Sequence, residues 1–205
     1  SIFFLGLTAG QMLFGPLSDS IGRKPAIYLG MVMFMAGCAL SIVATDFTTM
    51  LAGRALQGFG VAAPRTVAVA LIRDQFGGRA MARIMSFVMT VFILVPVAAP
   101  ALGQVILFFA DWREIFVFFL ALAIVALLWF GLRQPETLPV EKRITFSFGR
   151  IGRAIIEVCR NRVAFSNAVA AGFVFAGMIG YLTSSQQIFQ DTYQLGTMFP
   201  VYFAI

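Results

Sequence analysis

The chain has 205 residues, of which 60% are hydrophobic and 12% are charged, whereas soluble domains carry about 25% charged residues. This composition excludes a soluble globular domain, and it excludes a disordered chain, which would be poor in apolar residues. The formal net charge is +6, but the basic residues lie between apolar runs and form no stripe, so we expect no nucleic-acid partner. The chain has no histidine, so we expect no metal site. Its two cysteines, Cys38 and Cys159, belong to no paired motif, so we expect no disulfide.

Apolar runs recur along the whole chain. A helix that crosses a bilayer needs about 20 mostly apolar residues, and six runs approach or exceed that length. A turn then precedes a seventh run, which reaches only to Ile205. We therefore predict an all-α, polytopic membrane protein. The runs cover residues 1–17, 26–44, 51–72, 84–110, 115–132 and 163–189, and the last covers residues 199–205.

Lysine and arginine are concentrated on one side of the predicted membrane. Alternate loops hold twelve of the 15 basic residues, whereas the opposite loops hold Arg113 alone. The positive-inside rule makes the basic side cytoplasmic, which predicts a bacterial inner-membrane protein. Residue 1 then lies on the outer side, already within an apolar run, so we expect an internal segment of a longer, transporter-sized chain.

The predicted cytoplasmic connection of residues 133–162 contains an amphipathic segment. Phe148, Ile151, Ile155 and Val158 recur at helical spacing, while arginines occupy the other face. Such a helix can lie on the inner leaflet, or it can be a solvated linker helix without a lipid role. The sequence leaves both interpretations open.

The first cytoplasmic turn, residues 15–25, reads G-P-L-S-D-S-I-G-R-K-P. Its paired glycines, Gly15 and Gly22, permit a tight turn. Asp19 ends one predicted helix and Arg23 opens the next, so an ion pair or a cap is expected there. A plain positive-inside turn would need neither the aspartate nor the glycines.

Several further motifs follow in order. They are R-A-L-Q-G at residues 54–58, I-R-D-Q-F at 72–76, A-R-I-M-S at 82–86, V-P-V-A-A-P-A-L-G at 95–103, D-W-R-E-I-F at 111–116 and P-E-T-L at 135–138. Together with the first turn they resemble the major facilitator superfamily, and within it the Bcr/CflA-type drug:proton antiporters. Three residues depart from the pattern of that family: Ser20, Ala99 and Gln104.

The resemblance implies a helical bundle of two pseudo-symmetric halves, of which this chain would supply helices 2–7 and the start of helix 8. Residues 1–132 would then be helices 2–6 of the N-terminal half, residues 133–162 the central loop, and residues 163–205 the start of the C-terminal half. Spacing and resemblance together suggest a cytoplasmic latch in one state, formed by Asp19, Gly22, Arg23, Arg73 and Asp74.

The third run has polar residues on one helical face. At 100° per residue, Gln57, Gly58 and Arg65 lie within 60° of Arg54. Cations on a membrane helix are costly unless they meet water, a carboxylate or a substrate, so we expect this stripe to line a polar pathway or to take part in proton coupling. The alternative is that the arginines reach the membrane surface with their long side chains.

The fourth run contains Pro96 and Pro100, four residues apart and followed by Gly103. Each proline removes a helical hydrogen bond and bends the axis. We expect this helix to reshape when a cavity changes sides, the alternative being a fixed kink that serves packing alone.

Uncharged polar residues gather near the outer end of the sixth run. Tyr181, Gln186 and Gln187 are candidates for a substrate cavity, or they mark the water interface. No carboxylate lies inside any predicted span, and in the related antiporters the coupling acid is usually on a first helix that this chain lacks.

These observations predict a proton-coupled exporter of small amphipathic drugs. Its expected partners are the drug, protons and the lipid bilayer, with no cofactor beyond the proton gradient and no oligomeric partner. A sugar or metabolite carrier of the same superfamily is the alternative. An integral membrane enzyme or a scaffold is disfavoured, because we find no nucleophile with a partner and no paired carboxylates.

Overall fold

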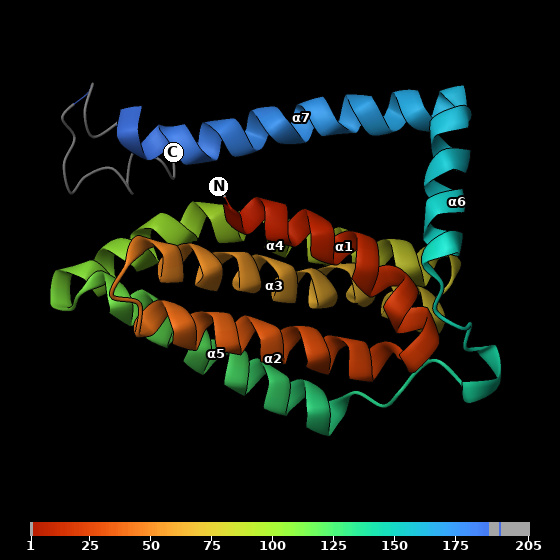
Figure 1. The fold of residues 1–205 in the computed structure, drawn as a ribbon, viewed down its shortest axis with the longest axis horizontal. Coiled ribbons are helices and arrows are strands. Elements are labelled where there is room, and N and C mark those ends of the chain that lie inside the picture. The colour runs from red at the N-terminus through yellow and green to blue at the C-terminus, as the bar shows by residue number, and fades with distance from the viewer. Residues whose placement is uncertain (1, 189–192, 194–205) are drawn as a thin grey trace. The chain divides into compact units, whose positions relative to one another are not determined.

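The computed structural model describes residues 2–188 and residue 193, and these residues are helical almost throughout (Figure 1). No strand occurs among them, which confirms the all-α prediction. The elements are α1 (Ile2–Ile21), α2 (Arg23–Ile42), α3 (Phe47–Gln75), α4 (Gly78–Phe109), α5 (Trp112–Arg133), the short 3-10 helix η1 (Val140–Lys142), α6 (Phe148–Arg160) and α7 (Arg162–Gln187).

Each of the six predicted apolar runs falls on one long helix, α1 to α5 and α7, with ends shifted by a few residues. Five helical segments are long and apolar enough to cross a membrane: α2, α3, Gly78–Pro96 within α4, α5, and Arg162–Ser185 within α7. Helix α1 is not among them. The predicted seventh run lies outside the described residues.

The chain divides into two compact units, which we describe separately. The first unit contains the described residues up to Thr90 together with Phe109–Ser147, and the second contains Val91–Phe108 and the described residues from Phe148 onward. Helix α4 contributes to both. Residues 132 and 162 fall at the end of α5 and the start of α7, but the predicted division into transporter halves stays a prediction.

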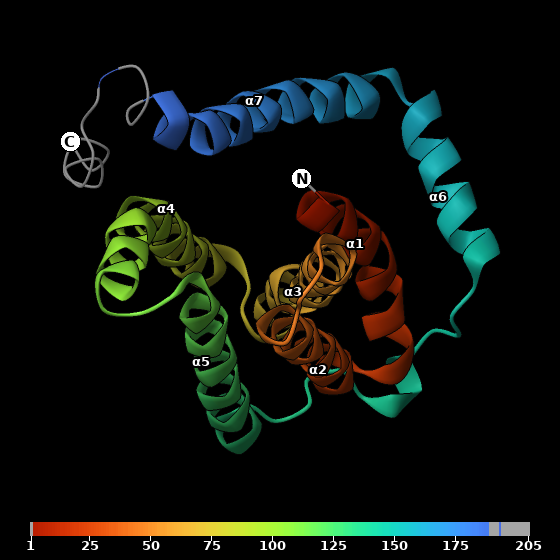
Figure 2. The same cartoon turned by 60° about the vertical axis from the view of Figure 1, so that its left-hand side comes forward.

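The first unit is built around α3, which packs against both α1 and α2 (Figure 2). Glycines let these backbones approach closely, as is usual between membrane helices. A Cβ atom on Gly6 of α1 would overlap the carbonyl oxygen of Ala55, and one on Gly58 of α3 would overlap that of Phe3. The close packing of α1 on α3 therefore requires a glycine at position 6.

Helix α5 lies beside α2 and is attached to it near both ends (Figure 2). Arg113 Nη2 donates to the carbonyl oxygen of Ala44 at 3.0 Å, and Lys24 Nζ donates to that of Gly131 at 2.8 Å. Between these points many large apolar side chains of α5 are exposed, including Leu128 at 62% and Trp129 at 68%. An apolar surface of this kind suits contact with lipid or with further helices.

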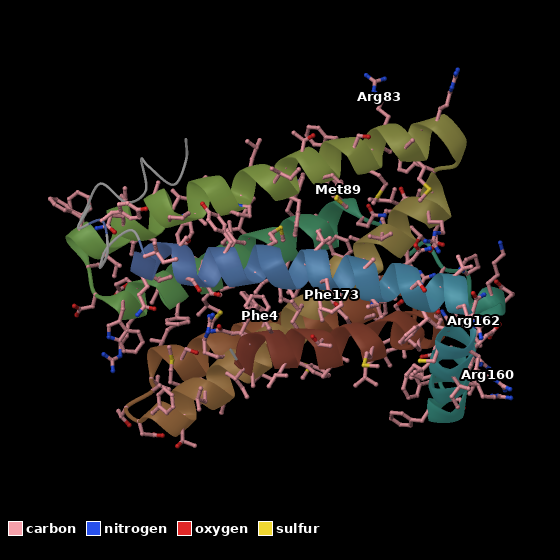
Figure 3. All side chains as sticks on the ribbon, turned by 90° about the horizontal axis from the view of Figure 1, so that it is seen from above. Phe4, Arg83, Met89, Arg160, Arg162 and Phe173 are labelled. Atoms are coloured by element: carbon pink, nitrogen blue, oxygen red, sulfur yellow. The ribbon has the colours of Figure 1, made fainter. Side chains whose placement is uncertain are left out.

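In the second unit, α6 is followed directly by α7. The side chain of Asn161 caps α7 by accepting hydrogen bonds from the backbone N–H groups of Val163 and Ala164, both at 3.1 Å. Arg160 ends α6 and Arg162 begins α7 (Figure 3). The predicted amphipathic segment is thus a helix, with its apolar residues Phe148, Ile155 and Val158 exposed.

Candidate functional site

A single arginine joins the predicted cytoplasmic ends of three helices. Arg23 is the first residue of α2, and its side chain is only 10% exposed. Its Nη1 donates to Asp19 Oδ1 at 2.5 Å and to Ser18 Oγ at 2.7 Å, and its Nε donates to Asp74 Oδ2 at 2.9 Å. Asp19 lies in the last turn of α1 and Asp74 in the last turn of α3. Hydrogen bonds between ionised groups are roughly twice as strong as neutral ones, so this cluster clamps the three helix ends together.

The start of α2 depends on a carboxylate from a distant part of the chain. Gly22 precedes the helix and has no side chain with which to cap it. Glu136, in the loop after α5, accepts from the backbone N–H of Arg23 through Oε1 and from that of Lys24 through Oε2, both at 3.0 Å. Pro25 has no N–H, so Glu136 satisfies both exposed donors at the beginning of this helix.

Glu136 also orders its own loop. Its Oε1 accepts from the backbone N–H groups of Thr137 and Leu138, each at 2.9 Å. Partial burial opposes ionisation of this carboxyl, but the backbone N–H groups of Leu138, Lys24, Arg23 and Thr137 outweigh burial and hold its pKa below the ordinary value of 4.5. Glu136 is therefore an anion at neutral pH, placed at the positive end of the α2 dipole.

Gly22 has a backbone conformation that suits this contact. Its φ of +107° is one that residues with a side chain rarely adopt. A Cβ atom at this position would lie 2.6 Å from Glu136 Oε2 and 3.0 Å from Arg143 Nη2. The glycine is thus needed both for the turn and for the close approach of the loop.

The same loop touches two further members of the cluster. The backbone N–H of Ile144 donates to the carbonyl oxygen of Asp19 at 2.9 Å, and Thr137 Oγ1 donates to Asp74 Oδ2 at 3.4 Å. The segment from Gln134 to Ser147 therefore lies across the α1–α2 turn and closes over the arginine cluster.

The structure brings together four of the five residues predicted for the latch: Asp19, Gly22, Arg23 and Asp74. Arg73 is exposed, and it forms no hydrogen bond or ion pair within the described part of the chain. Arg73 does not join the cluster, because adjacent helical residues point 100° apart and only the carboxylate of Asp74 attracts Arg23. That the cluster acts as a latch stays a prediction.

Sequence reasoning assigned no role to Glu136. The motif P-E-T-L was noted only as a family likeness, although a signal was present. A helix that begins G-R-K-P, with neither a capping side chain nor an acidic first turn, needs an acceptor from elsewhere. The sequence could not say which carboxylate would reach it.

A second polar group lies at the other end of α3. Arg54 Nη1 donates to Gln57 Oε1 at 2.8 Å, and Gln57 Nε2 donates to Ser41 Oγ of α2 at 3.2 Å. The Arg54 guanidinium also lies 4.9 Å from the ring centre of Phe3 and 5.7 Å from that of Phe116. Such cation–π contacts stabilise a partly desolvated arginine, so this cation is held by α1, α3 and α5 together.

The predicted polar stripe on α3 is only partly open. Gln57 is 1% exposed and packs against α2, and Gly58 packs against the backbone of α1. In this conformation these two residues face neighbouring helices, and the expectation that they line a route stays a prediction. Arg65, by contrast, is exposed. Helical angles place residues on one face, but they do not say which part of that face another helix covers.

The predicted bend residues lie within one continuous helix. Helix α4 extends through Pro96 and Pro100 to Phe109, and both prolines and Gly103 are partly exposed. A Cβ atom on Gly103 would meet nothing within 4 Å among the described residues. The expectation that this helix reshapes during transport stays a prediction.

The predicted cavity residues lie at the end of α7. Tyr181 is 57% exposed and Gln187 is exposed, while the side chain of Gln186 lies outside the described part. Their role in a substrate cavity stays a prediction. No group of three or more metal-ligating side chains was found among the described residues.

The whole chain matches a known family. The sequence model of the Major Facilitator Superfamily covers residues 1–205. The chain belongs to the Major Facilitator Superfamily. The resemblance carried by the motifs is thereby confirmed, and the cluster around Arg23 is the structure that the first-turn motif forms in this member of the superfamily.

Characterised and uncharacterised members of the Major Facilitator Superfamily are similar to the chain. It is 32% identical to an uncharacterised MFS-type transporter, YdgK, of Bacillus subtilis, over 98% of this chain and 51% of that protein. It is 33% identical to a bicyclomycin resistance protein homolog of Haemophilus influenzae, over 93% and 48%. It is 27% identical to the multidrug resistance protein MdtM of Escherichia coli K12, over 96% and 48%. The chain thus spans about half the length of the curated relatives it matches.

Proposed function

We propose that the chain belongs to an exporter that moves small amphipathic drugs out across the bacterial inner membrane, driven by inward proton flow. The observation that carries this proposal is the buried Arg23 shared by Asp19 and Asp74. The names of the relatives, which include bicyclomycin resistance and multidrug resistance proteins, support drugs as the cargo. The exporter would act as a monomer embedded in lipid.

The arginine cluster suits a latch that opens and closes. It joins three helices through side chains near their ends, so it can break without disturbing the helix interfaces. Its two ion pairs have side-chain exposures of 10% and 23% for Arg23 and Asp74, and 45% for Asp19. Allosteric couplings between states usually amount to about 1–3 kcal/mol, and loss of one such pair would change the balance between inward-facing and outward-facing states by a comparable amount.

Other residues would serve the transport cycle. Carriers of this kind generally work by a rocking motion of their two halves about a central substrate site. Arg65 would line the route or respond to proton occupancy, and Arg54 would do so from its position between Phe3 and Phe116. Pro96 and Pro100 would let α4 change shape, because neither supplies a backbone N–H to the helix.

The test uses the full-length protein in sealed vesicles, with bicyclomycin as the added drug. We expect drug addition to release protons in proportion to drug movement. The variants Asp74→Asn and Arg65→Ala should reduce both signals about tenfold, as loss of about 1.4 kcal/mol would. Glu141→Gln, an acidic residue of η1 in the same loop, is the matched control and should transport normally.

Two results would overturn the proposal. If both variants exported drug at the rate of the unaltered protein, the assigned roles would be wrong. If drug moved without protons, or if a sugar but no drug moved, the protein would be a carrier of another kind within the superfamily.

A further inference from the structure

Helix α6 exposes an apolar face. At 100° per residue, its large apolar side chains share an arc of about 160° around the helix axis. They are Phe148, Ile151, Ile155, Ile156 and Val158. Ile156 is 57% exposed, and among the described helices α6 packs to more than a marginal extent only against α7. The sequence left open whether this face meets lipid or water.

The charged residues of α6 lie on the opposite side. They occupy an arc of about 80° and are Arg150, Arg153, Glu157 and Arg160. Arg150 and Arg160 stand at the two edges of this arc, next to the apolar face. The three arginines are exposed, and none forms an ion pair with a described carboxylate. An arginine at such an edge can lay its aliphatic stem along an apolar surface and extend its guanidinium to a phosphate. This order of apolar, cationic and solvated positions matches the order of layers at the surface of an anionic bilayer.

The junction with α7 fixes the direction of α6. Asn161 alone separates the two helices, and its side chain caps α7. Helix α6 runs across the axis of α7 (Figure 1 and Figure 3). The segment Arg162–Ser185 of α7 is long and apolar enough to span a membrane, and Arg160 and Arg162 mark its first end as cytoplasmic. When α7 crosses the bilayer, α6 therefore lies along the cytoplasmic surface of that bilayer.

We propose that α6 is an interfacial helix that binds the inner leaflet, with its apolar face among the upper acyl segments and its arginines at the phosphates of anionic lipids. The crosswise junction places the helix at the level of the headgroups, where the apolar face is buried without any change in the fold. In water the same face would remain hydrated, which is unfavourable. The contact holds the connection between α5 and α7 at the membrane surface, and it requires neither drug nor protons.

Cys159 offers a probe, because it lies within the apolar arc and is exposed. The test attaches a nitroxide to Cys159 in the full-length protein, with every other cysteine replaced by alanine, in vesicles that contain phosphatidylglycerol. Oxygen concentrates in the acyl region, whereas a neutral nickel chelate stays in water. We expect frequent collisions of the nitroxide with oxygen and rare collisions with nickel. The opposite pattern is expected for Glu157→Cys in a Cys159→Ser background, because position 157 lies on the charged side.

The role of the arginines is tested by their removal, at the lowest fraction of phosphatidylglycerol that protects Cys159 from nickel. Each basic residue at an anionic membrane surface contributes roughly a fivefold preference for the bound state. Arg150→Gln combined with Arg160→Gln should therefore shift α6 about 25-fold towards a detached state, seen as more nickel collisions at Cys159. The matched control is Arg79→Gln combined with Arg83→Gln, at exposed arginines near the start of α4, and it should leave the collisions unchanged.

Three results would overturn the proposal. Rare collisions with both agents at Cys159 would show that another part of the protein covers the apolar face. Frequent nickel collisions at Cys159 in the unaltered helix would show that α6 is a solvated linker. Equal protection of Cys159 with and without Arg150 and Arg160 would show that these arginines do not hold the helix on anionic headgroups. None of these measurements involves transport, so failure here is distinguishable from failure of the proposed function.

Discussion

Removal of the Glu136 carboxylate should loosen the attachment of α2 to the rest of the first unit. In Glu136→Ala, the backbone N–H groups of Arg23 and Lys24 lose their acceptors, which lie 3.0 Å away in the unaltered protein. Loss of a helix cap costs about 1 kcal/mol, and hydrogen bonds to a charged group contribute about 1.5–3 kcal/mol. Because Glu136 is partly exposed and water can replace it, we expect the lower part of this range, about 1–2 kcal/mol.

Cys38 provides the assay. It lies on α2 and has 0% exposure, so we expect it to react with a thiol reagent only when α2 separates from its neighbours. With the exposed Cys159 replaced by serine, the labelling rate of Cys38 reports the population of the open state. A loss of about 1–2 kcal/mol raises that population about 5–30-fold.

The control is Glu141→Ala, which removes an acidic residue from η1 of the same loop. It should leave the labelling of Cys38 unchanged. If Glu136→Ala and Glu141→Ala labelled Cys38 at the same rate, the carboxylate of Glu136 would not support α2, and the reasoning from its hydrogen bonds would fail.

Three further predictions follow from the same contacts. The pKa of Glu136 is lowered in the folded state, so the contribution of its carboxylate to stability is present above a pH of about 4.5 and is lost as the pH falls through the folded pKa. The difference in melting temperature between the unaltered protein and Glu136→Gln should therefore shrink as the pH is lowered. A constant difference down to pH 3 would contradict this prediction. Gly22→Ala should lower the unfolding free energy by about 1–3 kcal/mol, because alanine is strained at a φ of +107°. Gly77→Ala, whose Cβ would meet nothing within 4 Å among the described residues, should cost little in the same denaturant titration. Gly6→Val should disrupt the packing of α1 on α3 by about 2 kcal/mol or more, measured as the yield of folded protein by size-exclusion chromatography, whereas Gly172→Val on α7 should give a normal yield.

Apolar content and its spacing were sufficient to predict the helices. Burial of backbone groups in lipid requires helices of a certain length, so runs such as residues 115–132 could be placed within a few residues of α5. The ion-pair cluster around Arg23 was predicted in part for a similar local reason. Asp19 and Arg23 are four residues apart, and an ion pair at that spacing needs little knowledge of the fold.

Residues that act across long sequence separations could not be assigned in this way. Glu136 caps a helix that begins 113 residues earlier, and nothing in its neighbourhood marks it for that role. Gln57 shares a helical face with Arg54, but its burial against α2 follows from the close approach that Gly37 allows. Whether a polar residue lines a route or packs between helices depends on which neighbour covers it.

The sequence by itself determined that this protein is helical, that it has several segments suited to a membrane, and which of their ends are basic, because each of these depends on the interaction of short segments with lipid and water. The tertiary structure alone decided that Asp74 rather than Arg73 meets Arg23, and that Glu136 caps the start of α2. These depend on how helices approach one another, which is set by side-chain size and backbone contacts summed over whole interfaces.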